Sequence, residues 1–143
     1  MISCFTFIDK NGENIHIDSD SLRRWCLGNK ELEIFSIPLQ QKLAEEFLLN
    51  NVISMTRVLE LAKRDKLDPI IMAKDGTFSP DNGGPNVMLV DGHHRYALAV
   101  AIGRETIPGY MLEVEQWRPF ELKWVPKMTM EQLIRMPLTK RDY

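Results

Sequence analysis

The residues best suited to chemistry form one run, Asp91-Gly92-His93-His94-Arg95, which combines a carboxylate, two imidazoles and a guanidinium around a glycine. A short apolar run at 87–90 precedes it, and an apolar stretch at 96–102 follows it and ends at Gly103. This order predicts a strand, a tight turn and a helix with a glycine stop. A helix that begins at such a turn directs unpaired N–H groups and the positive end of its dipole to one place. That place favours an anion, most often phosphate.

Each side chain of the run has a candidate role. Gly92 lets a ligand approach the backbone, and Arg95 offers a planar, bidentate donor for phosphate oxygens. His93 and His94 add donors that depend on pH, and Asp91 is the nearest carboxylate for a divalent cation or for base catalysis. Structural roles are the alternatives to these functional ones: the histidines can be structural hydrogen bonders or surface residues, and Arg95 can be an internal salt-bridge partner that holds the helix.

The elements before this run are predicted from periodicity and caps. Alternation at 4–8 and again at 15–17, around Asn11-Gly12, predicts a hairpin. The run 18–21 offers N-cap side chains for a short helix that Gly28 is expected to stop in a left-handed conformation. Apolar residues spaced by four predict a helix over 39–51, and Ser54 can cap a further helix at 54–66.

The spacing of apolar residues changes in the second half of the chain. Residues 70–72 and 87–90 read as short buried strands joined by a long polar loop at 73–86, and 107–114 predicts another strand. The capping box Thr129-x-x-Gln132 predicts a C-terminal helix. The chain is therefore expected to be one α+β domain over 1–143, a small mixed sheet flanked by helices, with an N-terminal hairpin and a C-terminal helix.

Composition narrows the functional classes. The chain has 143 residues, 44% of them hydrophobic, and a formal charge of −2. Its longest apolar run is the seven residues 96–102, so no membrane span is expected, and we predict a soluble, cytoplasmic protein. The acidic balance disfavours nucleic-acid binding through bulk electrostatics. Two cysteines, Cys4 and Cys26, provide neither a disulfide framework nor a zinc site by themselves.

The segments 69–71, 87–97 and 103–108 resemble the core of the ParB/sulfiredoxin-like superfamily. The resemblance covers about 37–112 and leaves 113–143 as a C-terminal extension. It implies the ParB/sulfiredoxin-like fold, with a turn that binds the phosphates of ATP, ADP or another nucleotide together with Mg²⁺. Members include CTP-binding partitioning proteins, sulfiredoxins, free-serine kinases and small ParB-like nuclease-domain proteins, so fold transfers more safely than activity.

Departures from the superfamily patterns separate its members. Sulfiredoxins need a cysteine where His93 stands, and partitioning proteins carry a Gly-Glu-Arg-Arg turn and a DNA-reading module, so both activities are disfavoured. Because His93 stands where the sulfiredoxin-like pattern has its reactive side chain, the resemblance implies a catalytic role for it, and its loss is expected to reduce turnover more than affinity. The turn resembles kinase-type and small members, which implies a phosphotransferase or nucleotide hydrolase with a small-molecule or protein acceptor. The alternatives are a non-catalytic nucleotide-sensing or protein-interaction module and a ParB-like DNA-binding or nuclease protein.

Candidates outside the turn are weaker. Glu45 and Glu46 are possible bases for an acceptor hydroxyl, although charges on an amphipathic helix more often form a solvated face. Arg57 can reach a phosphate or pair with a nearby carboxylate. The aromatic tail can cover the open face of the sheet, or it can form a surface for a protein partner or a homodimer; its residues are Trp117, Phe120 and Trp124.

Overall fold

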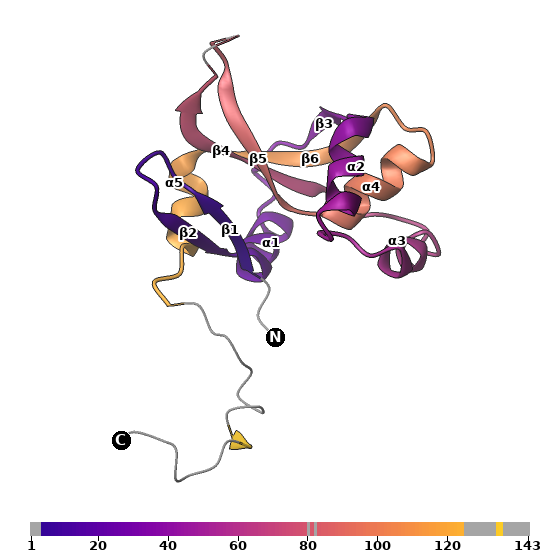
Figure 1. Cartoon of the computed structure of the whole chain (residues 1–143), viewed down its shortest axis with the longest axis horizontal. Coiled ribbons are helices and arrows are strands. Elements are labelled where there is room, and N and C mark those ends of the chain that lie inside the picture. The colour runs from indigo at the N-terminus through magenta and orange to yellow at the C-terminus, as the bar shows by residue number, and fades with distance from the viewer. Residues whose placement is uncertain (1–3, 80, 82, 125–133, 136–143) are drawn as a thin grey trace.

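A mixed four-stranded sheet forms the centre of the computed structural model, which describes residues 4–79, 81, 83–124 and 134–135 (Figure 1). Its strands are β3 (Phe35–Pro38), β4 (Ile70–Phe78), β5 (Pro85–Asp91) and β6 (Thr106–Leu112), in the order β3-β6-β4-β5. Strands β4 and β6 are parallel, and the other two pairings are antiparallel. This arrangement confirms the predicted α+β class and the small mixed sheet.

The sheet is covered on both faces because β4 is hydrophobic on both sides. Ile70 and Met72 face a cluster formed with three helices, whereas Ile71 and Ala73 face a second cluster on the other side, as the two-residue period of a strand requires. The helices on the first face are α2 (Gln41–Leu49), α3 (Met55–Leu61) and α4 (His93–Ala101).

The second face is covered by the N-terminal hairpin and short helices. They are β1 (Cys4–Ile8), β2 (Asn14–Asp18), α1 (Ser19–Gly28), α5 (Val114–Trp117) and the 3₁₀ helix η1 (Arg118–Phe120). Trp117 joins this layer to the sheet, because its indole N–H donates to the Lys74 carbonyl at 2.8 Å and its ring meets Phe7 edge-on. Trp117 and Phe120 thus cover the sheet as one alternative predicted, while Trp124 is exposed.

Several local predictions are confirmed. The hairpin forms in the predicted place, Asp18 caps α1 by accepting from the Ser21 amide, and Ser54 caps α3 by accepting from the Arg57 amide. At the end of α4, Gly103 adopts φ +84°, so it terminates this helix as predicted.

Other boundaries are corrected. Gly28 does not stop α1 in a left-handed conformation: it lies inside the helix, and Asn29 caps it with an extended backbone. The predicted loop at 73–86 is largely strand, because β4 and β5 continue as a hairpin in which Asp75, Thr77 and Asn86 hydrogen-bond within the polar segment. The helix expected at 54–66 ends at Leu61.

The predicted C-terminal helix at 129–136 lies almost wholly outside the described residues. Among the residues that the structure describes, no helix is long and apolar enough to cross a membrane.

Candidate functional site

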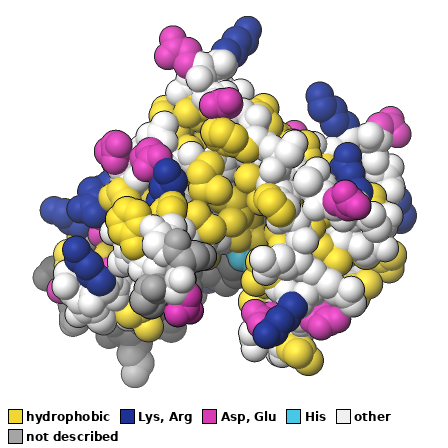
Figure 2. Space-filling model, turned by 90° about the horizontal axis from the view of Figure 1, so that it is seen from above, with side chains coloured by type: hydrophobic (Ala, Val, Ile, Leu, Met, Phe, Trp, Pro, Cys, Tyr) yellow, Lys and Arg dark blue, Asp and Glu magenta, His cyan; other side chains and the backbone are white. Residues whose placement is uncertain are grey.

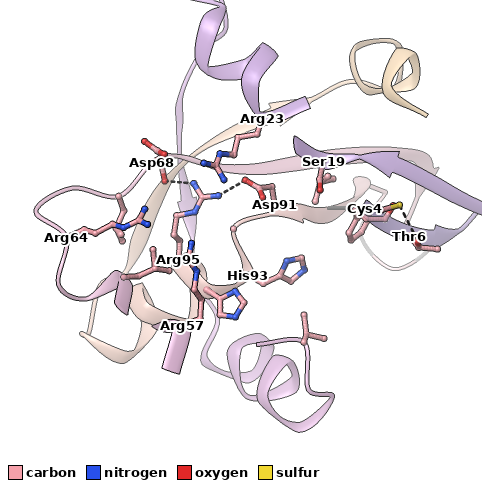
Figure 3. Close-up of a pocket in the computed structure, with 17 residues that line it drawn as sticks. Cys4, Thr6, Ser19, Arg23, Arg57, Arg64, Asp68, Asp91, His93 and Arg95 are labelled. Atoms are coloured by element: carbon pink, nitrogen blue, oxygen red, sulfur yellow. Dashed lines mark hydrogen bonds and ion pairs between the residues drawn. The ribbon is translucent and has the colours of Figure 1, made fainter. Parts of the chain in front are cut away.

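A cavity of about 550 Å³ lies where the sheet, the hairpin and the helices meet, at the start of α4 (Figure 3). Strand β1 and helix α1 bound it on one side, and α3 with the segment that follows it bounds the other. The whole run Asp91 to Arg95 lines this cavity.

Gly92 makes the turn from β5 into α4. It is the N-cap of α4 with φ +105°, and it offers no side chain to the N–H groups of the first turn. A Cβ at this position would lie 2.6 Å from Cγ2 of Ile70 and 3.1 Å from Nη2 of Arg95. Only glycine therefore allows the turn to lie this close to the beginning of β4.

Arg95 is buried and its guanidinium binds to the protein itself. Nη1 donates to the carbonyls of Asp68 and Pro69, at 2.9 and 2.8 Å, and Nη2 donates to the carboxylate of Asp91. This geometry matches the structural alternative for Arg95, an ion pair that holds the helix and the turn, more closely than a free phosphate ligand. Asp91 lines the cavity but shares its charge with Arg95.

Three other arginines face the cavity from separate elements: Arg23 from α1, Arg57 from α3 and Arg64 from the segment after α3. Figure 3 shows their labelled side chains grouped around Arg95. Arg57 has only an exposed, 3.4 Å contact with Glu60, and neither Arg23 nor Arg64 has an ion pair within the described part of the chain.

The charge balance of the cavity is positive. Four arginines line it against two aspartates, Asp68 and Asp91, which leaves an excess of two positive charges with the histidines neutral. Mutual repulsion of the guanidinium groups is relieved when an anion lies between them. The electrostatics therefore favour a multiply charged anion over a cation.

The two histidines have different surroundings. His94 accepts a hydrogen bond from the Ser54 amide on Nε2, at 3.0 Å, which joins α4 to the cap of α3 and requires the ring nitrogen to be unprotonated. Burial lowers the pKa of His94, and the neighbouring Arg57 lowers it further. His94 is thus a neutral hydrogen-bond acceptor at neutral pH.

His93 lies between two phenylalanines. Its ring stacks on Phe5 with centroids 6.3 Å apart and meets Phe47 edge-on at 4.9 Å. Burial lowers the pKa of His93, while the charge of Asp91 opposes this effect. The ring links the hairpin layer to the helix layer at the edge of the cavity.

Glu45 and Glu46 do not reach this cavity. Both are exposed on α2, and Glu45 lines a different hollow while accepting from Gln41 at 3.1 Å. The reason is the orientation of α2, which packs Leu43 and Phe47 against the core. The structure therefore does not bring these two carboxylates together with the turn.

Sequence reasoning missed Arg23, Arg64 and Asp68. The basic pairs Arg23-Arg24 and Lys63-Arg64 were visible, but on amphipathic segments they are indistinguishable from an ordinary solvated face. Only the packing of α1 and α3 around the same turn reveals their convergence.

The metal candidate Asp91 is not part of a ready-made metal cluster. Among residues 4–79, 81, 83–124 and 134–135, no three His, Cys, Asp or Glu side chains are grouped so as to hold a metal ion. Magnesium commonly uses one or two carboxylates together with substrate phosphates, so Asp91 and the exposed Asp68 are the residues here that could contact it.

Comparison of the sequence with known proteins gave no matching family model and no matching curated protein.

Proposed function

We propose that this protein binds the phosphate groups of a nucleotide in the arginine-lined cavity and acts as a phosphotransferase or nucleotide hydrolase. The observation that carries the proposal is the convergence of Arg23, Arg57 and Arg64, from three segments, on the uncapped first turn of α4. The resemblance of the turn to nucleotide-binding members of the ParB/sulfiredoxin-like superfamily supports the choice of a nucleotide.

In this proposal the residues divide into two groups. The three arginines and the first N–H groups of α4 hold phosphate oxygens. Enzymes catalyse phosphoryl transfer mainly by positioning the phosphate in this way and by stabilising its developing charge. Arg95 and Asp91 act as positioning residues, because their ion pair fixes the turn. Asp91 and Asp68 are the carboxylates available to contact a nucleotide-bound Mg²⁺ or an acceptor hydroxyl.

Calorimetric titration with ATP and ADP in the presence of Mg²⁺ tests the binding. A charge-assisted hydrogen bond contributes about 1.5–3 kcal/mol, so Arg23→Ala and Arg64→Ala should each weaken binding by roughly tenfold or more. Arg104→Ala is the matched control, since Arg104 is exposed and outside the cavity. No nucleotide binding by the unmodified protein would refute the proposal, as would equal losses in all three variants.

Turnover is measured separately, as formation of ADP from bound ATP with and without added alcohols, because hydrolysis and transfer to an alcohol both yield ADP. Loss of ADP formation in Asp68→Asn, with ATP affinity retained, is the expected result for a catalytic carboxylate. Binding without any turnover would restrict the protein to a nucleotide-sensing role.

A further inference from the structure

A second hollow, of about 570 Å³, adjoins the arginine-lined cavity and is predominantly apolar. It crosses the helix-facing side of the sheet between α2 and α4, and all four strands contribute to it, among them Ile37, Met111, Met72 and Leu89. Figure 2 shows hydrophobic side chains gathered in a hollow on this face, with a histidine at its edge. We refer to it as the apolar groove.

The groove has few groups that could recognise a polar ligand. Its polar lining is limited to Gln40, His93 and the hydroxyl of Tyr96, and this hydroxyl already accepts from the Gln40 amide at 2.8 Å. The volume lies within the range of small-molecule sites, which are mostly apolar. A hydrocarbon group fits such a lining better than a nucleobase, whose edge would leave hydrogen bonds unsatisfied.

Phe5 and His93 line both the groove and the arginine-lined cavity. Their stacked rings form the boundary, and Phe47 closes it on the groove side. An excess of positive charge and an apolar surface therefore lie on either side of one pair of rings. This combination is complementary to a molecule with an anionic head and a hydrocarbon tail.

We propose that the protein binds a phosphate monoester of an apolar alcohol, with the phosphate among the arginines and the hydrocarbon chain in the apolar groove. The inference rests on the proposed function for its phosphate end and adds the class of molecule that carries the phosphate. In a phosphotransferase, such an ester is the phosphorylated form of the acceptor.

Methionine methyl groups report on the groove directly. Met72 and Met111 line it and belong to the cluster on the helix-facing side, whereas Met55 is exposed on α3 and lines a different hollow. In ¹³C-methyl spectra, octyl phosphate below its micelle concentration should shift these two groove methyls and leave Met55 unchanged. Because each methylene buried in the groove adds favourable hydrophobic transfer free energy, octyl phosphate should bind at least about tenfold more tightly than inorganic phosphate. It should also bind more tightly than 1-octanol.

Two pairs of variants distinguish binding of the phosphate group from binding of the hydrocarbon chain. Val87→Glu places a charge in the groove at a half-exposed position and should weaken octyl phosphate by roughly tenfold without changing inorganic phosphate affinity. Leu59→Glu, an exposed position on α3 outside the groove, is its control and should change neither. Arg64→Ala should weaken both phosphate ligands, and Arg104→Ala neither.

Octyl phosphate that binds no more tightly than phosphate, or that shifts Met55 as much as the groove methyls, would overturn the inference. The proposed function can fail separately. If ATP does not bind while octyl phosphate gives the expected pattern, the proposal of a nucleotide ligand is refuted and the proposal of a phosphate-ester ligand is supported. If ATP binds through the arginines and octyl phosphate leaves the groove methyls unshifted, only the proposal of a phosphate-ester ligand is refuted.

Discussion

At the scale of single residues, the arginines near the turn differ in their partners. Arg95 has three internal acceptors, and with Asp91 it forms a largely buried ion pair. Removing one partner of such a pair leaves the other charge uncompensated, so Arg95→Ala should lower the free energy of unfolding by roughly 3 kcal/mol. Urea denaturation measures this loss, and Arg23→Ala, which removes no ion pair found among the described residues, should be nearly neutral.

An Arg95→Ala protein with unchanged stability and no anion binding would contradict this assignment. It would restore Arg95 as the phosphate ligand that the sequence suggested.

The histidines predict a dependence of stability on pH. Burial lowers the pKa of both His93 and His94 below the ordinary value of 6.5. The unfolded chain therefore binds more protons than the folded chain as the pH falls below about 6.5. Stability should be complete above that pH and should decrease from there down through the lowered, folded-state pKa values.

Urea midpoints at pH 7.5 and pH 5.5 check this expectation, with the lower stability at pH 5.5. The variant His93→Gln should show a smaller difference between the two midpoints. An unaltered difference would show that the titration of His93 is not its cause.

At the scale of elements, the turn from β5 into α4 depends on the missing side chain of Gly92. Gly92→Ala combines a left-handed backbone with a Cβ 2.6 Å from Ile70, so we expect a loss of about 2–5 kcal/mol. Gly12→Ala is the matched control: φ is +79° there as well, but nothing lies within 4 Å of the added Cβ. Its cost should be limited to about 1–2 kcal/mol of backbone strain.

Denaturant midpoints of the two glycine variants, compared with the unmodified protein, give the difference. Equal losses would show that close packing on Ile70 does not constrain the turn.

The same element shows what the sequence could predict. The strand, the turn and the helix around Asp91 and Gly92 were predictable, because apolar runs and a glycine between them are local signals. The β4–β5 hairpin was mistaken for a loop, because its polar residues satisfy one another across the strands, and sequence periodicity does not show such pairing.

At the scale of the whole molecule, Trp117 fastens the hairpin layer to the sheet. It is 2% exposed, and its N–H donates to the backbone carbonyl of Lys74. Trp117→Ala should therefore cost about 3–5 kcal/mol. Trp124, with 85% of its surface exposed, is the control and should be nearly neutral on replacement. Thermal unfolding followed by circular dichroism distinguishes them, and equal melting temperatures would contradict the role of Trp117.

The packing of the layers also explains why the site was only half predictable. Arg23 and Arg64 are 41 positions apart in the sequence. Helices α1 and α3 lie on opposite faces of the sheet, and the two arginines share a cavity because both layers meet at the start of α4. Local sequence patterns indicate neither fact. Glu45 and Glu46 were predicted as bases only because carboxylates can accept a proton, and the orientation of α2 separates them from the cavity.

Arginine side-chain ¹⁵Nε–¹Hε spectra, recorded while pyrophosphate is added, distinguish the proposed phosphate ligands Arg23, Arg57 and Arg64 from Arg95, which pairs with Asp91 in the turn. The signals of Arg23, Arg57 and Arg64 should shift together with one saturation curve, and those of Arg95 and Arg104 should move little. Shifts confined to Arg95, or no saturable shift of Arg23, Arg57 or Arg64, would show that the phosphate does not bind among these three arginines.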